Sequence, residues 1–277
     1  MKEEKRREGR PRRLRFIPHP SSLIPSEGGA MSQDIDDLLQ GWNFQPGMVQ
    51  ARLVQARDGR QVIQMRVDLG VLQMETTGRP DGTRPHGFPT YFDYLVQEAR
   101  PTDGSEQSFV LTDEQCLEAD REFVQLYHRR ICWLALQKFA PALADADHTL
   151  AFMDFVRDHS PDEDYTQAHE QYRGFVLFQR TQAAAALAVE QKKPDQAIDE
   201  IAACLEKLQA FFASFGAEEQ MEENAMVRQL RQMENSLRQS HGIGATLREQ
   251  LQNAIANEEY EIAAKLRDAL RRQEEKE

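Results

Sequence analysis

The chain has 277 residues, a formal net charge of −12 and 40% hydrophobic residues. This hydrophobic content is sufficient for a folded core, and the acidic balance argues against general nucleic-acid binding, which requires clustered Lys and Arg side chains. The sequence has no apolar run long enough to span a bilayer. We therefore expect a cytoplasmic protein with one large or two medium domains and a tail.

Residues 1–30 differ in composition from the rest of the chain. They are rich in Lys and Arg from Lys2 to Arg15, and prolines then interrupt every apolar stretch, which is unlike a signal peptide. We expect a disordered basic extension, or a start of translation at Met31. A basic arm that binds nucleic acid is the alternative.

Residues 31–100 have the pattern of a small β-containing domain. Apolar and polar residues alternate on both sides of Asp58-Gly59, a pair that strongly favours a tight hairpin turn. A third strand is expected after the break at Gly70, which gives a β-hairpin or meander. In chain order the predicted elements are a short helix at Asp36–Leu39, strands at Met48–Ala56, Gln61–Leu69 and Val71–Glu75, and a helix with an aromatic face from Tyr91 to Leu95.

The loop at 78–87 is rich in Gly and Pro, which fits a turn that needs these residues for its geometry. It does not contain the GxxxxGK[ST] pattern of a phosphate-binding loop. The alternative is an enzyme or a ligand-binding protein with its site on this loop. The side chains that would form such a site are Asp68, Arg79, Asp81, Arg84 and His86.

Residues 112–216 are predicted to form a helical scaffold. Thr112 with Gln115 has the spacing of a capping box, as do Ser160 and Glu163, and Pro194 suits the first position of a helix. The expected helices lie near 113–138, 140–159, 161–192 and 194–215.

An internal repeat runs through this scaffold. Ala142-Leu143 recurs as Ala197-Ile198, each near the start of a helix that follows another amphipathic helix. This pattern resembles the second helix of tetratricopeptide repeats, in longer and degenerate units. A four-helix bundle with Ala-rich seams is the open alternative.

Candidate metal ligands are scattered through the scaffold. No pair of histidines has helical ligand spacing with a third ligand nearby, and the cysteines form no CxxC pair. We expect no metal, no cofactor and no catalytic residues, with the cysteines buried as small apolar side chains. The residues concerned are His128, His148, His159, His169, Cys116, Cys132 and Cys204.

Residues 217–241 are predicted to form a connecting helix. Its apolar seam, with spacings of four, three and four, is typical of pairing with another helix. The segment 241–244 contains two glycines and is expected to act as a hinge. The seam consists of Met226, Leu230, Met233 and Leu237.

The segment 245–277 is predicted to be a short antiparallel helical hairpin. One apolar stripe begins at Leu247 and Leu251, and a second runs from Ile262 to Leu270, while Asn257 and its acidic neighbours separate the two. The hairpin is too small to bury its own apolar face, so we expect it to dock on another surface.

At these residues the chain resembles the UVR domain, the UvrB/UvrC motif found in excision-repair proteins, in ClpC-type chaperone ATPases and in the kinase activator McsA. Tyr260 takes a place that phenylalanine usually holds in the family. The resemblance implies a protein-protein contact and no catalytic residue. The implied partner-binding residues are Leu247, Leu251, Ala254, Ile255, Tyr260, Glu261, Ala263, Ala264, Leu266, Arg267, Asp268 and Leu270.

The sequence thus predicts an α+β protein that is mainly α. It indicates a non-enzymatic adaptor that docks a partner protein through the hairpin, and the resemblance to the UVR domain links such an adaptor to DNA repair or protein quality control. The implied partner is another UVR-containing protein or a second copy of this chain, without direct nucleic-acid or membrane binding. The sequence lacks the ATPase loop, any nuclease signature and the paired cysteines of McsA-type activators.

Overall fold

The computed structural model describes residues 34–100 and 109–274, with side chains up to Arg272. The predictions for residues 1–30 and for a start at Met31 concern residues outside these ranges. The chain divides between Gly41 and Trp42 into two compact units. The first contains helix α1 (Asp36–Leu39), as predicted, and all other elements belong to the second.

The second unit begins with a three-stranded antiparallel meander. Strands β1 (Gln50–Gln55), β2 (Gln61–Val67) and β3 (Gly70–Glu75) lie in the order β1-β2-β3, with Leu53 opposite Ile63 and Ile63 opposite Met74. Gly59 has a φ of 86° in the turn between β1 and β2, a conformation that favours glycine. The predicted three-stranded sheet is confirmed.

One face of the sheet is apolar, and the other is mainly polar, with the buried Val62 on the same side as Gln64 and Arg66. Ile63 and Met74 belong to a buried cluster with Cys132, Trp133 and Ala142 from the helices. On the polar face the Arg66 guanidinium donates to the Trp42 carbonyl at 2.9 Å, and the Arg52 guanidinium lies 4.0 Å from the centre of the Trp42 ring. Strand β2 ends at Val67, so Leu69, which the sequence placed on the apolar face, is exposed in the following turn.

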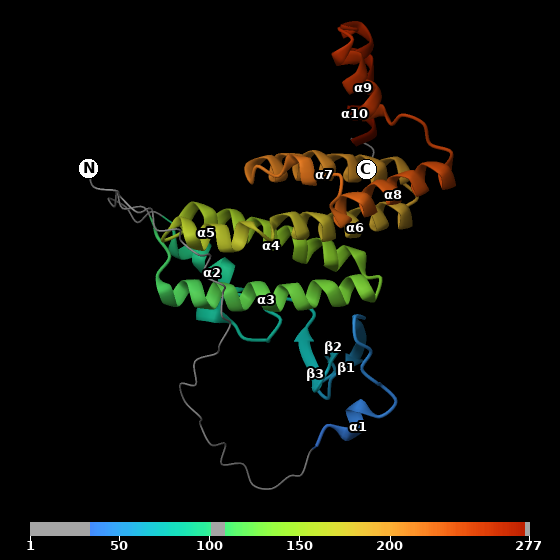
Figure 1. The fold of residues 1–277 in the computed structure, drawn as a ribbon. Coiled ribbons are helices and arrows are strands. Elements are labelled where there is room, and N and C mark those ends of the chain that lie inside the picture. The colour runs from blue at the N-terminus through green and yellow to red at the C-terminus, as the bar shows by residue number, and fades with distance from the viewer. Residues whose placement is uncertain (1–33, 101–108, 275–277) are drawn as a thin grey trace, which may run out of the picture. The chain divides into compact units, whose positions relative to one another are not determined.

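The rest of the second unit is helical, and its helices pack in chain order. Helix α3 contacts α4, α4 contacts α6, α6 contacts α7, and α7 contacts α8, as Figure 1 shows. The elements are α2 (Tyr91–Glu98), α3 (Asp113–Ala135), α4 (Phe139–His159), α5 (Glu163–Glu170), α6 (Arg173–Glu190), α7 (Pro194–Ser214), α8 (Ala225–His241), α9 (Leu247–Ala256) and α10 (Tyr260–Glu274), with 3-10 turns at Pro85–Gly87 and Glu218–Gln220. The expectation of a mainly helical protein is confirmed.

One long helix at 161–192 was a wrong prediction, because α5 ends at Glu170 and α6 begins at Arg173. The Ser160–Glu163 capping box does not form; Asp162 caps α5 instead, accepting from the Tyr165 amide at 2.7 Å. Gly174 follows the break, where an added Cβ would lie 3.0 Å from the Phe211 ring. Glycine suits this close approach, because an added Cβ would require the Phe211 ring to shift, and glycine is a weak helix former.

The helix expected from residue 217 begins only at Ala225. Residues Glu218–Gln220 form a 3-10 turn, and the Asn224 side chain caps α8 by accepting from the Met226 amide at 2.9 Å. The apolar seam of α8 packs against the buried cluster of α6 and α7, with Leu230 at its centre. The seam thus pairs with helices of its own chain.

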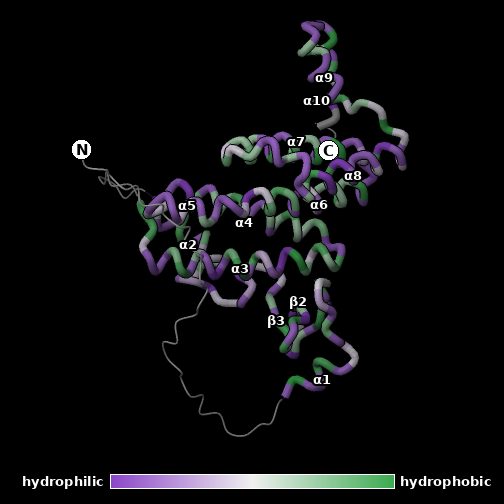
Figure 2. Tube along the Cα trace, viewed as in Figure 1, coloured by the Kyte–Doolittle hydropathy of each residue, from purple (hydrophilic) through white to green (hydrophobic). Residues whose placement is uncertain are grey.

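Figure 2 shows hydrophilic and hydrophobic residues alternating along α8, α9 and α10. This alternation is expected of helices that cover one apolar side and leave the other side in water. For α8 the apolar side is covered by α7. For α9 and α10 it is covered only in part.

Candidate functional site

The C-terminal hairpin consists of α9 and α10, which pack against each other. Thr246 starts α9 with a capping box: its backbone amide donates to Glu249 Oε2 at 2.7 Å, and its hydroxyl accepts from the Glu249 amide at 3.3 Å. These two bonds satisfy amides that a helix start would otherwise leave without partners. The start of the hairpin is therefore encoded locally.

The turn of this hairpin also occurs twice in the scaffold. Gln137, Lys192 and Glu258 have left-handed backbones, with φ of 54°, 61° and 60°. The residue after each donates its amide to a carbonyl five positions back, as in Lys193 to Ala188 at 2.9 Å and Glu259 to Ala254 at 2.8 Å. The helix pairs α3–α4, α6–α7 and α9–α10 therefore share one turn geometry, and the repeat seen in the sequence has a structural counterpart.

Alanines close the interior of the C-terminal hairpin. Ala254 is 3% exposed and Ala263 is 8% exposed, since small side chains let the two backbones approach closely. These two members of the predicted partner-binding set lie inside the hairpin and hold its helices together. Five other members are half-buried: Leu247, Leu251, Ala264, Leu266 and Leu270.

The free end of the hairpin exposes large apolar side chains. Ile255 is 54% exposed, Tyr260 is 68% exposed and Ile262 is 48% exposed. We call these three residues the apolar tip. Glu258, Glu259 and Glu261 are exposed around it, and the remaining predicted members, Arg267 and Asp268, are exposed further along α10. Neighbouring exposed apolar side chains with a polar rim are typical of an interaction surface.

The other end of the hairpin is fastened to the scaffold. Gly242 ends α8 with a left-handed backbone, and the Ile243 amide donates to the Arg238 carbonyl at 3.0 Å. The Arg238 side chain bridges Glu234 on its own helix and Glu249 on α9. The segment that the sequence indicated as a hinge is thus a short connection between α8 and α9. Polar contacts of Arg238 join the two helices across it.

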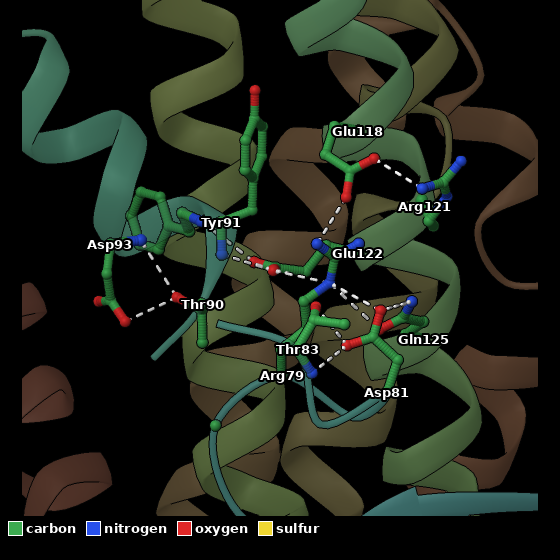
Figure 3. A network of polar contacts seen from close by, with 12 residues as sticks. Arg79, Asp81, Thr83, Thr90, Tyr91, Asp93, Glu118, Arg121, Glu122 and Gln125 are labelled. Atoms are coloured by element: carbon green, nitrogen blue, oxygen red, sulfur yellow. Dashed lines mark hydrogen bonds and ion pairs between the residues drawn. The ribbon is translucent and has the colours of Figure 1, made fainter. Parts of the chain in front are cut away.

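The loop at 78–87 was the alternative site, and its Arg79 is buried against α3. The guanidinium lies 2.5 Å from Glu118 Oε1, 3.3 Å from Asp81 Oδ2 and 3.6 Å from Glu122 Oε2. Gln125 of α3 also donates to Asp81 at 2.9 Å. Figure 3 shows these side chains converging between the loop and α3.

Glu122 connects this network to α2. Its buried carboxylate accepts the amides of Tyr91 at 2.6 Å and Phe92 at 3.1 Å, the first two residues of α2, as drawn in Figure 3. A carboxylate at a helix N-terminus satisfies free amides and complements the helix dipole. The network therefore attaches both the loop and α2 to α3.

Arg129 makes a third attachment from α3. Its guanidinium binds the Asp145 carboxylate of α4 through two bonds, at 2.9 and 2.7 Å, and donates to the Gly78 carbonyl at 2.8 Å. Sequence reasoning missed Glu122, Arg129 and Asp145 as buried residues. A signal was present, because Glu118, Glu122, Gln125 and Arg129 recur at helical spacing on one face.

The other side chains of the alternative site lie apart from this network. His86 has a φ of 50°, is exposed, and stacks on Tyr94 with ring centres 3.9 Å apart. Arg84 and Asp68 are also exposed. Within the described ranges, no hydrogen bond or ion pair joins Asp68 or His86 to Arg79 or Asp81. The geometry fits a loop that Arg79 and Asp81 attach to α3.

Histidines of the scaffold contact neighbouring polar groups, and its cysteines are buried. His169 Nε2 lies 3.0 Å from Asp120 Oδ1, and His159 Nδ1 lies 3.0 Å from the Phe109 carbonyl. All three cysteines are free and buried, and burial raises the pKa of the Cys132 thiol to about 12. In the part of the chain that the structure describes, no group of three or more His, Cys, Asp or Glu side chains is arranged to hold a metal ion.

Comparison with protein families identifies the C-terminal hairpin. Residues 245–276 match the UVR family, described as the UvrB/uvrC motif, and this range contains all of α9 and α10. No curated protein and no solved structure matched the chain. The UVR motif is typical of modules for protein interaction or of proteins associated with DNA repair. Among the described residues, no helix has the length and apolarity needed to cross a membrane.

Proposed function

We propose that this protein is a non-enzymatic adaptor that binds a partner protein through the apolar tip of the α9–α10 hairpin. The observation that carries the proposal is the exposure of Ile255, Tyr260 and Ile262 within a matched UVR segment. These side chains are not needed to close the hairpin, because Ala254 and Ala263 do so. Fully burying one large apolar side chain contributes about 1.5–3 kcal/mol, so three can drive association.

The proposed partner is another UVR-containing protein or a second copy of this chain. The acids Glu258, Glu259 and Glu261 around the tip are exposed and favour a partner surface with cations at its edge. The same acids disfavour contact with nucleic acid. The pathway that suits such an adaptor is DNA repair or protein quality control.

The scaffold would hold the hairpin and the N-terminal sheet in one assembly. The repeated turn at Gln137 and Lys192 supports a tetratricopeptide-like arrangement of α3–α4 and α6–α7. An enzyme site on the loop at 78–87 is not favoured, since Arg79 and Asp81 bind side chains of α3. We therefore assign this loop a structural role in the proposal.

Measuring how tightly tip variants bind the partner protein tests this function. Crosslinking in the native cell followed by mass spectrometry would first name the partner. The purified chain should then bind it, and Tyr260→Ser combined with Ile262→Ser should reduce binding by at least about tenfold, the effect of losing about 1.4 kcal/mol. Tyr172→Ser is the control, because Tyr172 is similarly exposed, at 55%, but lies on the scaffold. Equal binding by all three proteins would contradict the proposal.

A further inference from the structure

The base of the hairpin contacts α7 through one carboxylate. Asp199 of α7 accepts the hydroxyl of Thr246 at 2.6 Å, and its other oxygen lies 3.5 Å from Arg248 Nε. Thr246 is buried although it is the residue that starts α9. A carboxylate of the scaffold therefore lies at the N-terminus of α9, the end of a helix that attracts anions.

Few residues of the hairpin base contact α7. A further hydrogen bond, from Gln252 to Glu206 at 3.4 Å, is long, and a cavity of about 480 Å³ separates α7 from the hairpin base. Leu247 and Leu270 line this cavity from the hairpin, and Ala203 and Lys207 line it from α7. Helices α7 and α8 are joined by close apolar packing. Between α7 and the hairpin base, polar bonds around the cavity take the place of such packing.

The chain between the scaffold and the hairpin permits a pivot. Gly242 has a φ of 64°, and an added Cβ at Gly242 or Gly244 would meet no atom within 4 Å. The Arg238 side chain spans this segment by contacting Glu249. Movement of the hairpin therefore requires the loss of a few polar contacts, among them the bond of the buried Thr246 hydroxyl to Asp199 and the Arg238–Glu249 pair. It requires no repacking of the buried apolar clusters, which contain no residue of the hairpin.

We infer that Asp199 and Thr246 form an intramolecular latch that regulates how much of the hairpin is available for docking. With the latch closed, Leu247 and Leu270 face α7 across the cavity, and only the apolar tip is free. Release of the latch lets the hairpin pivot at Gly242–Gly244 and uncovers the two leucines, which extends the apolar surface from the tip to the base. The role of this surface in binding rests on the proposed function, whereas the latch itself does not.

Burial of the Asp199 carboxyl agrees with a closed contact. Loss of water raises the pKa of this group, while the Thr246 hydroxyl and Arg248 act in the opposite direction. The neighbouring Asp195 lies one turn earlier on α7 and also lines the cavity, but it is exposed. Asp195 therefore provides a matched control, because its replacement removes the same charge from the same cavity.

Thiol labelling of the full chain tests the latch. Leu247→Cys introduces a thiol at the hairpin base, whereas the three native cysteines are buried and supply a measurable background. Adding Asp199→Ala should raise the rate of maleimide labelling at position 247 by roughly tenfold, the effect of losing one hydrogen bond to a charged group. Adding Asp195→Ala should leave the rate unchanged, and labelling of Ile255→Cys at the tip should be the same in all backgrounds.

Equal labelling rates in the Asp199→Ala and Asp195→Ala backgrounds would overturn the latch. Hydrogen exchange in the chain without added cysteines provides a second measurement, in case Leu247→Cys itself opens the contact. Asp199→Ala should speed amide exchange in peptides covering 243–250 and leave peptides from α4 unchanged; no change at 243–250 would also overturn the proposal. Neither readout involves a partner, so a failure of the latch is distinguishable from a failure of partner binding.

Discussion

The hairpins α6–α7 and α9–α10 have the same turn but different surroundings. Lys192 and Glu258 share a left-handed backbone, and the buried alanines Ala197 and Ala263 hold equivalent places after the turn. The first hairpin is covered by α4 and α8, which bury its apolar residues in one cluster. The second leaves the apolar tip exposed.

This difference shows that one local design serves two roles. The turn and the helix caps within a helical hairpin determine its shape, and alanines let its two helices pack closely. The larger apolar side chains then lie on the outer face of the hairpin. Where neighbouring helices cover that face, the hairpin is part of the core. Where no helix of the described chain covers it, the hairpin is available to a partner.

Breaking a buried charge pair should have the largest effect on the scaffold. Arg129→Ala would leave the Asp145 carboxylate buried without its partner, and we expect a loss of about 3–5 kcal/mol in the free energy of unfolding. Denaturant unfolding followed by circular dichroism measures this loss. The exposed pair of Arg157 with Asp154 gives the control, since Arg157→Ala should change stability by about 1 kcal/mol or less. Equal losses would show that the α3 network does not stabilise the fold.

Replacing one isoleucine in each hairpin should show that the two hairpins differ in how much their apolar residues contribute to stability. Ile201 of α7 is fully buried, whereas Ile255 of α9 is largely exposed. Ile201→Ala should cost about 2–5 kcal/mol because it leaves a cavity, and Ile255→Ala should change stability by about 0.5 kcal/mol or less. Thermal unfolding of both variants tests the comparison. A similar cost at the two positions would mean that the tip is covered in the native protein.

Overpacking should affect the C-terminal hairpin alone. Ala254→Leu places a large side chain between α9 and α10, where close approach needs alanine, and should cost about 1–3 kcal/mol. Hydrogen exchange should increase in α9 and α10 and remain unchanged in α4 and α6. Increased exchange throughout the scaffold would contradict a hairpin that is attached only by its base.

The smallest effect on stability is expected at Tyr260. Tyr260→Ser removes an exposed ring and should change the free energy of unfolding by about 0.5 kcal/mol or less. Partner binding should nevertheless decline, since the tip would lose its most exposed aromatic group. Calorimetry of unfolding and binding on the same sample compares the two effects. A destabilised protein would indicate that Tyr260 belongs to the hairpin interior.

Local signals in the sequence were sufficient for much of this fold. Asp58-Gly59 predicted its hairpin turn, Thr112 and Gln115 formed their capping box, and the stripe after Leu247 predicted the C-terminal hairpin. Each depends on residues close in the chain, where turn chemistry and helical spacing decide the outcome. The UVR segment was identified for the same reason.

Features that depend on distant contacts were missed. The break before Arg173 accompanies the approach of Phe211 to Gly174, and Asp162 replaced Ser160 as the cap of α5. The division of the predicted set at the hairpin into buried Ala254 and exposed Tyr260 likewise required the packing of two helices. The spacing of residues in the sequence predicts which of them share a helix face. Which of those residues stay exposed depends on where the neighbouring helix packs.

Site-specific photo-crosslinking tests the central claim most directly. A photoreactive phenylalanine analogue would replace Tyr260 in one strain and Tyr172 in another, because both tyrosines are exposed but only the first lies at the apolar tip. Irradiation of living cells should give a discrete crosslinked protein at position 260, lost when Ile262→Ser is added, and none at position 172. The same crosslinks at both positions, or none at position 260, would contradict docking through the tip.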